Sequence, residues 1–219
     1  MWCIGKLTAE YCQRMYDLLD LYARPYRKEE PVVCIDEKSK QLLEQPRKPI
    51  AASPGNPIKE DYEYKRAGTR NIFMAIEPKG GRRQVEVTSR RTKRDFVRFI
   101  SHLVKKVYAG AHKIHLVMDN LNTHFWGSFE EVLGVQRATH LLERVEFHYT
   151  PKHASWLNMA EIEIGIMDRQ CLGRRLPNEQ TLRLEVAAWM HRRNRARSTI
   201  AWKFTRQDAD QKMSRHYVS

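Results

Sequence analysis

The sequence has few cysteines and lacks long apolar runs, and each absence excludes a class of protein. Its four cysteines are scattered without CxxC spacing, which indicates neither a zinc site nor a disulfide framework. The longest apolar runs, such as residues 114–118, are far too short to cross a bilayer. Residues 1–15 include acidic and polar side chains, whereas a secretory signal needs a basic start and a continuous apolar stretch. We therefore expect a cytoplasmic protein without a membrane span.

What the sequence does contain is enough apolar material for one folded domain and a large excess of positive charge. The 219 residues are 42% hydrophobic and 10% aromatic, which argues against a mostly disordered chain. Lys and Arg number 39 against 26 Asp and Glu, which gives a formal net charge of +13. Such an excess attracts polyanions through steering and counterion release, so nucleic acid is the expected partner.

The basic residues are concentrated in two runs, one between residues 79 and 98 and one between residues 191 and 197. Either run alone is also typical of a solvated surface, but two runs that flank acidic residues favour contacts with phosphates. We therefore expect the following residues to contact DNA: Arg82, Arg83, Arg90, Arg91, Lys93, Arg94, Arg192, Arg193, Arg195 and Arg197.

Hydrophobic periodicity and turn residues predict alternating strands and helices, which is the pattern of an α/β fold. Strands are expected over residues 31–36, 71–78, 82–89, 114–119 and 144–149. Helices are expected over residues 8–21, 92–108, 128–142 and from about 157 to 171. Prolines at positions 46, 49, 54 and 57 predict an exposed loop between two of the strands.

Acidic residues close two of the predicted strands, at Asp36 and at Asp119. A carboxylate at the end of a buried strand is costly to desolvate unless a cation or donor faces it, and ligands bind at strand ends in open α/β sheets. A third acid comes from the helix near residue 157, where Glu161 and Glu163 flank opposite edges of one apolar stripe and periodicity does not separate them. Three carboxylates from separate elements suit Mg²⁺, and two such ions about 3.5–4 Å apart can activate an attacking oxygen and stabilise a leaving one.

Three blocks of the sequence resemble the catalytic blocks of DDE transposases in the bacterial insertion-sequence branch of the mariner superfamily. They are VVCIDEKSKQLL, VMDNLNTHF and HYTPKHASWLNMAEIEI, in the family's order between residues 32 and 164. The family pattern has a first Asp on the opening strand, a second Asp in a DN dipeptide, and an acid shortly after Leu-Asn. Asp36, Asp119 and Glu161 match these places, so the resemblance selects Glu161 over Glu163 as the third catalytic and metal-binding residue.

The resemblance implies a ribonuclease H-like fold, with a mixed central sheet flanked by helices. It also implies cleavage and rejoining of DNA strands with two Mg²⁺ ions, for which Mn²⁺ can substitute. The implied partners are DNA, as transposon ends and target, and a second copy of the chain on that DNA, in the nucleoid of a bacterial cytoplasm. Four polar residues beside the blocks are expected to orient phosphates or waters, although loop capping and helix-end hydrogen bonds explain them equally: Asn120, His124, His153 and Asn158.

The chain also departs from the family pattern. Relatives carry helix-turn-helix domains ahead of the catalytic core, whereas the first block here begins at residue 32, so we expect an N-terminally truncated chain. The interval from Asp119 to Glu161 is longer than usual, which we interpret as an insertion around residues 130–144. The expected division is an N-terminal helix and lead-in over 1–30, the catalytic domain over 31–175, and a basic helical segment over 176–219.

Two alternatives to a transposase catalytic domain stay open. One is another nuclease with a ribonuclease H-like fold, and the other is a non-catalytic DNA-binding remnant of a mobile element.

Overall fold

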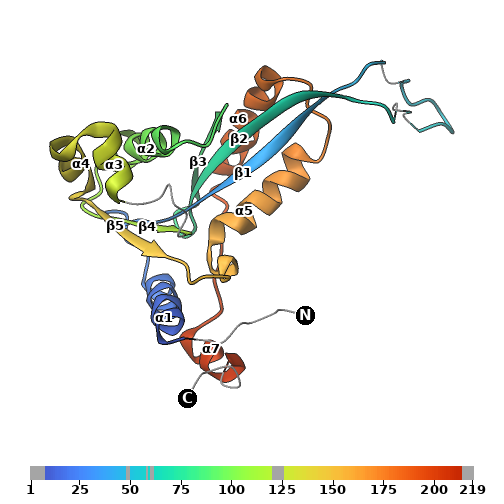
Figure 1. Cartoon of the computed structure of the whole chain (residues 1–219). Coiled ribbons are helices and arrows are strands. Elements are labelled where there is room, and N and C mark those ends of the chain that lie inside the picture. Colours follow the sequence, from blue (N-terminus) through green and yellow to red (C-terminus); the bar gives the residue numbers. More distant parts are fainter. Residues whose placement is uncertain (1–7, 48–49, 58, 60–61, 120–125, 214–219) are drawn as a thin grey trace.

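A mixed β-sheet forms the centre of the protein. The structure, a computed structural model, describes residues 8–47, 50–57, 59, 62–119 and 126–213. Within them five strands lie in the order β3-β2-β1-β4-β5 (Figure 1). The strands are β1 (Val32–Glu44), β2 (Lys65–Glu77), β3 (Arg82–Thr88), β4 (Ile114–Met118) and β5 (Val145–Tyr149). Strands β1, β2 and β3 pair antiparallel, whereas β4 pairs parallel with both β1 and β5, which confirms the predicted mixed sheet.

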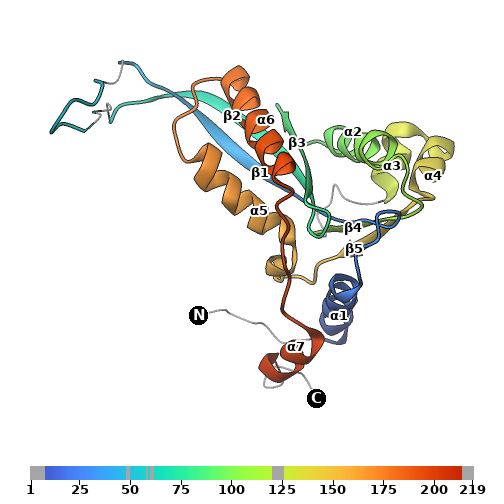
Figure 2. The ribbon, with the colours of Figure 1, turned by 180° about the vertical axis from the view of Figure 1, so that it is seen from behind.

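Helices cover both faces of this sheet (Figures 1 and 2). The α-helices are α1 (Ala9–Ala23), α2 (Lys93–His102), α3 (Trp126–Leu133), α4 (Val135–Leu142), α5 (Met159–Met167), α6 (Glu179–Arg195) and α7 (Arg206–Met213). Two π-helical segments, η1 (Leu103–Val107) and η3 (Asp168–Leu172), continue α2 and α5, and a 3-10 turn, η2 (Ser155–Leu157), precedes α5. One core joins the sheet to α2, α3 and α4, and two further cores join the opposite face to α1, α5, α6 and α7.

The alternation of side chains along β1 and β4 decides which face carries the predicted acids. On β1, Val33 and Ile35 lie in the core with α2, whereas Cys34 lies in the core with α1 and α5. On β4, Val117 also lies in the core with α1 and α5. Because strand side chains alternate with period two, residues 36 and 119 belong to the same face as Cys34 and Val117, the face that α5 covers.

Polar side chains cap the predicted helices at their N-termini. The Thr8 hydroxyl accepts a hydrogen bond from the Tyr11 backbone N–H at 3.2 Å, at the start of α1. Thr92 and Asp95 form a reciprocal capping box at the start of α2, in which each side chain accepts a bond from the other residue's backbone N–H. These caps confirm the helices expected from residues 8 and 92.

Two predicted boundaries were wrong. The helix expected over residues 128–142 is two helices, α3 and α4, because Gly134 between them has a φ of +79°, which a continuous right-handed helix does not allow. The strand expected over residues 31–36 continues as β1 to Glu44 and pairs with an equally long β2. These two strands extend together away from the rest of the protein in Figure 1, and the proline-containing loop joins their far ends.

The C-terminal segment packs against the sheet and against α1. The Asn194 side chain of α6 accepts a hydrogen bond from the Arg83 backbone N–H at 2.7 Å and donates one to the Arg83 carbonyl at 2.9 Å. Helix α7 contacts α1, where the Tyr16 hydroxyl donates a hydrogen bond to Asp210. Among the described residues, no helix combines the length and apolar character needed to span a membrane.

Candidate active site

Two of the predicted acids lie on neighbouring parallel strands. Cys34 of β1 pairs with Val117 of β4, and Asp36 and Asp119 each follow two residues later. Because the strands run in the same direction, this register carries both carboxylates to the same edge and face of the sheet. Both residues are half-buried.

The third acid comes from the first turn of α5, and a buried asparagine fixes that turn against β1. The Asn158 side chain accepts a hydrogen bond from the Ala160 backbone N–H at 3.1 Å, as the N-cap of α5. Its amide group donates to the Ile35 carbonyl at 2.8 Å, directly before Asp36. The Tyr22 hydroxyl holds the approach to the helix by donating to the Leu157 carbonyl at 2.7 Å. Glu161, exposed in the first turn, is thereby held close enough to Asp36 for its charge to act on that carboxylate.

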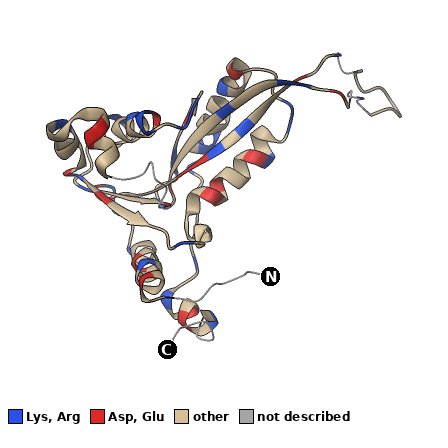
Figure 3. Ribbon diagram, viewed as in Figure 1, with Lys and Arg blue, Asp and Glu red and all other residues tan. Residues whose placement is uncertain are grey.

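The electrostatics of Asp36 show that the three acids interact. The pKa of Asp36 is raised to about 7, first by burial and then by the negative charges of Glu37, Asp119 and Glu161, which together outweigh one lowering hydrogen bond. That bond comes from the Glu37 backbone N–H to Asp36 Oδ1, at 2.8 Å. The acidic positions of β1 and α5 lie side by side in Figure 3. Asp36, Asp119 and Glu161, called the acidic cluster below, therefore form a concentration of negative charge.

The donor set of the acidic cluster fits a hard divalent cation. Carboxylate oxygens are the ligands that Mg²⁺ and Mn²⁺ take in proteins, usually completed by waters and substrate phosphates. A bound cation would also relieve the mutual repulsion that contributes to the raised pKa of Asp36. Asp36, Asp119 and Glu161 are thus the residues that would hold it.

Glu163, the glutamate that periodicity left as an alternative, has different surroundings. It is fully buried and accepts two hydrogen bonds from Arg83, at 2.7 and 3.0 Å, and two from Arg193, at 2.9 and 3.1 Å. Burial alone would raise the pKa of Glu163, but the two guanidinium groups lower it below the ordinary value. Glu163 therefore joins α5 to β3 and α6 as the centre of a buried ion network.

This network corrects the expected DNA-contact set. Arg83 is only 1% exposed and its guanidinium is bound to Glu163, so the prediction that Arg83 contacts DNA was wrong. Arg193 is largely committed to the same carboxylate, with 19% of its side chain exposed. Arg82 is exposed but donates to the Val107 carbonyl at 2.6 Å and lies over the Tyr108 ring.

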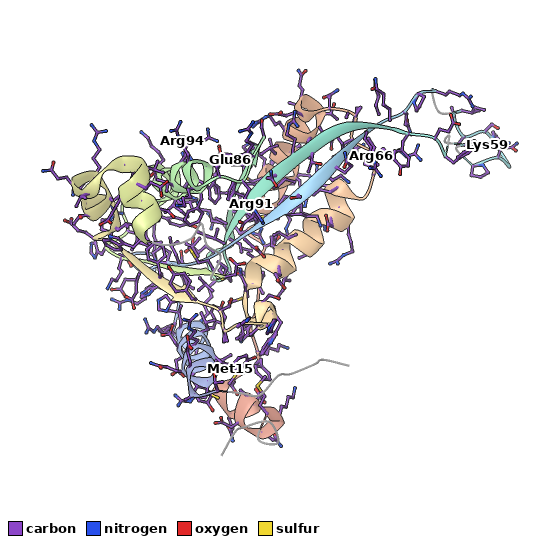
Figure 4. The ribbon with its side chains drawn as sticks, viewed as in Figure 1. Met15, Lys59, Arg66, Glu86, Arg91 and Arg94 are labelled. Atoms are coloured by element: carbon purple, nitrogen blue, oxygen red, sulfur yellow. The ribbon has the colours of Figure 1, made fainter. Side chains whose placement is uncertain are left out.

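The other expected basic residues remain at the surface, and several line one groove. A groove of about 760 Å³ between β3, α2 and α3 is bordered by Arg90, Lys93 and Arg94, together with Arg98 and Arg183. We call it the basic groove. Figure 4 labels Arg94, at the start of α2, beside Glu86 of β3. Arg91, which follows Arg90, pairs with a residue of β1, since its Nη1 lies 3.8 Å from Glu37 Oε1. Near the end of α6, the exposed basic residues are Arg192, Arg195 and Arg197.

The sequence analysis missed two residues of the basic groove, Arg98 and Arg183, and only Arg98 had a local signal. Arg98 follows Arg94 by four positions on α2, so the two side chains share the exposed face of the helix. Arg183 comes from α6 and reaches the groove only through tertiary packing, for which the sequence has no local signal.

The remaining expected residues differ in their placement. His153 is exposed in the loop before α5, with a φ of +64°. Asn158 is buried and forms the helix-end hydrogen bonds described above, the second of the two explanations considered for it. Asn120 and His124 lie outside the residues that the structure describes.

Solved structures that resemble this chain include complexes of the Mos1 transposase. The Mos1 strand transfer complex gives a TM-score of 0.60 at 12% sequence identity and covers 100% of this chain. The Mos1 paired end complex with Mg gives a TM-score of 0.56 at 13% sequence identity and covers 100% of this chain. The paired end complex with Mn gives a TM-score of 0.55 at 14% identity and covers 90% of this chain. The chain spans only 65%, 66% and 62% of those three proteins, respectively. The likeness confirms the ribonuclease H-like fold.

Comparison of the sequence with known families and proteins gives one clear match. No curated protein matches the chain significantly. The family model described as "DDE superfamily endonuclease" matches residues 31–183. Since this match covers more than half of the chain, the protein belongs to the DDE superfamily of endonucleases.

Proposed function

We propose that this protein is the catalytic domain of a transposase, which cleaves DNA at the ends of an insertion sequence and joins the freed ends to target DNA. The single observation that carries the proposal is the acidic cluster, in which Asp119, directly after β4, and Glu161 of α5 both act electrostatically on Asp36 of β1. Family membership and the surface basic residues are consistent with a DNA substrate.

Each part of the proposed site has a distinct task in this chemistry. Asp36, Asp119 and Glu161 would hold two divalent cations, Mg²⁺ or Mn²⁺. When bound, such ions activate an attacking oxygen and neutralise the oxygen that leaves the phosphate. The basic groove and the arginines at the end of α6 bind the DNA backbone, because phosphate contacts set position without reading sequence.

The buried residues around the site keep α5 in place during this reaction. The hydrogen bond from Asn158 to Ile35 fixes the start of α5 against β1. The hydrogen bonds of Arg83 and Arg193 to Glu163 fix the following turn of α5 against β3 and α6. A carboxylate held in this way needs little rearrangement when substrate binds, which is the advantage of a preorganised site.

We further propose that the active form on DNA is a homodimer, because joining two ends of one element requires two catalytic centres. Such an enzyme would act on DNA in the bacterial nucleoid. Sedimentation of the protein with and without a DNA duplex measures the stoichiometry, and a single chain per duplex at saturation would contradict the dimer.

The activity is tested by incubating the protein with supercoiled plasmid and Mg²⁺ or Mn²⁺. We expect metal-dependent nicking by the wild type and a loss of at least about 10²-fold with Asp119→Asn. Asp20→Asn is the matched control, because Asp20 is exposed on α1 and pairs only at the surface with Arg206. Equal nicking by the wild type and Asp119→Asn would refute the proposal.

The same assay separates the two alternatives. Faster cleavage of an RNA–DNA hybrid or of a four-way junction than of duplex DNA would indicate another ribonuclease H-like nuclease. DNA binding without any metal-dependent turnover would indicate a non-catalytic remnant.

A further inference from the structure

A second group of potential metal ligands lies away from the acidic cluster, on β4 and β5. His115 Nδ1 and His148 Nε2 are 3.0 Å apart, and both side chains are buried. Glu146 lies beside them, with carboxylate oxygens 3.8 Å from His115 Nδ1 and 3.7 Å from His148 Nε2. One ligand atom from each of the three residues fits within 4.8 Å of the others.

The strand register explains why these side chains converge. His115 pairs with Glu146 across the parallel β4–β5 ladder, and His148 lies two residues further along β5. All three therefore point to the same face of the sheet. His115 precedes Asp119 by four residues, which is about 13 Å along a strand, so the acidic cluster is a separate site.

An aspartate on α1 orients one of the two imidazoles. Asp17 Oδ2 lies 2.6 Å from His148 Nδ1. An ionised carboxylate only accepts hydrogen bonds, so Nδ1 of a neutral His148 carries the proton and its Nε2 lone pair points at His115. Carboxylate–histidine pairs of this kind are the usual support of a metal-binding imidazole.

A lysine orients the Glu146 carboxylate, and a cavity lies beside His115. Lys113 binds Glu146 Oε2 at 2.9 Å, which leaves Oε1 directed toward His148. A cavity of about 360 Å³, which His115 lines together with Tyr22 and Trp202, provides a path from solvent.

We propose that His115, Glu146 and His148 bind a transition-metal ion of the zinc class. Two imidazoles and one carboxylate are ligands that Zn²⁺ accepts and that Mg²⁺ does not prefer. Ligand atoms around tetrahedral Zn²⁺ are about 3.3 Å apart, so the two histidine nitrogens need to separate by only a few tenths of an ångström. Bound there, the ion would join β4 to β5 and, through Asp17, to α1. This site does not depend on the proposed transposase function.

The test measures Zn²⁺ binding to the full chain by calorimetry, in a double variant Asp36→Asn/Asp119→Asn that removes two carboxylates of the acidic cluster. We expect one Zn²⁺ per chain, a rise in Tm with Zn²⁺ but not with Mg²⁺, and visible absorption of a tetrahedral type with Co²⁺. His148→Gln should abolish these effects. Asp17→Asn should weaken Zn²⁺ binding by about 10–100-fold.

Two further variants keep the test decisive. Glu146→Gln removes a half-exposed carboxylate and leaves both imidazoles, so it serves where His148→Gln does not fold. His140→Gln is the matched control, because His140 is exposed on α4 beside Glu143. Absence of bound Zn²⁺ in the double variant, or binding that Glu146→Gln and His148→Gln leave unchanged, would overturn the proposal.

Discussion

Two glutamates of α5, only two positions apart, have opposite surroundings. Glu163 is buried and accepts four hydrogen bonds from two arginines, which hold its pKa below the ordinary value. Glu161 is exposed, and its negative charge contributes to the raised pKa of Asp36. The negative charge of Glu163 is neutralised by two arginines of the protein itself. The negative charge of Glu161 belongs to a site that a cation from solution would neutralise. A counter-charge within the protein, rather than position in the sequence, distinguishes the structural acid from the candidate catalytic one.

Paired substitutions test this comparison most directly. Glu163→Gln should lower the free energy of unfolding by about 3–5 kcal/mol, because it leaves the buried Arg83 without its counter-charge. Glu161→Gln should change it by no more than about 0.5 kcal/mol, because Glu161 is exposed, yet should abolish metal-dependent cleavage. Urea denaturation of both variants measures the difference. Similar losses of stability would contradict the assignment of separate roles.

The pH dependence of stability gives a smaller effect at the acidic cluster. The pKa of Asp36 is raised from 3.8 to about 7, so between these values the folded protein holds a proton that the unfolded chain has released. Stability due to this group is therefore fully present below pH 3.8 and is lost as the pH rises toward and through 7. With a metal chelator present, the free energy of unfolding of the wild type should therefore fall relative to that of Asp36→Asn as the pH rises from about 4 to above 7.

The comparison with Asp36→Asn cancels the titration of other groups, since both proteins contain them. At pH 8, Mg²⁺ should restore the stability of the wild type and leave the stability of Asp36→Asn nearly unchanged. The reason is that the cation, like the bound proton at lower pH, neutralises the charge of the carboxylates. Thermal unfolding from pH 4 to pH 8 measures both effects. Parallel stability curves for the two proteins would show that Asp36 titrates normally.

Much of this site was predictable from the sequence, and the rest depends on long-range pairing. Continuous apolar runs that end in an acid drew attention to Asp36 and Asp119, because a strand's burial is visible in its own residues; Asp119 does follow the end of β4, whereas Asp36 lies within β1, which continues to Glu44. That the two strands are parallel neighbours in register is a property of the whole sheet, and periodicity does not encode it. The choice of Glu161 over Glu163 as the catalytic acid rests on the resemblance and stays a prediction; the structure shows that Glu163 is bound by two buried arginines, which periodicity did not reveal.

The wrong assignment of Arg83 had a local signal that charge counting overrode. In β3 the sequence alternates Arg83, Val85 and Val87 on one side, and all three are buried, whereas Arg82 on the other side is exposed. Period-two alternation therefore predicts an inward Arg83, which in turn requires a buried acid as its partner. Counting basic residues in a run treats both sides of the strand as surface.

The smallest expected effect concerns the surface charges, which are compensated by solvent rather than by protein. Arg94 borders the basic groove, and Arg137 is exposed on α4 outside the set that lines it. If Arg94 contacts a phosphate, Arg94→Ala should reduce the slope of log affinity for duplex DNA against log salt by about 0.9, the value for one released counterion. Arg137→Ala should leave the slope unchanged. Because such contacts position the backbone without reading bases, the loss should be the same for unrelated duplex sequences, and equal slopes for all three proteins would exclude this groove as the DNA path.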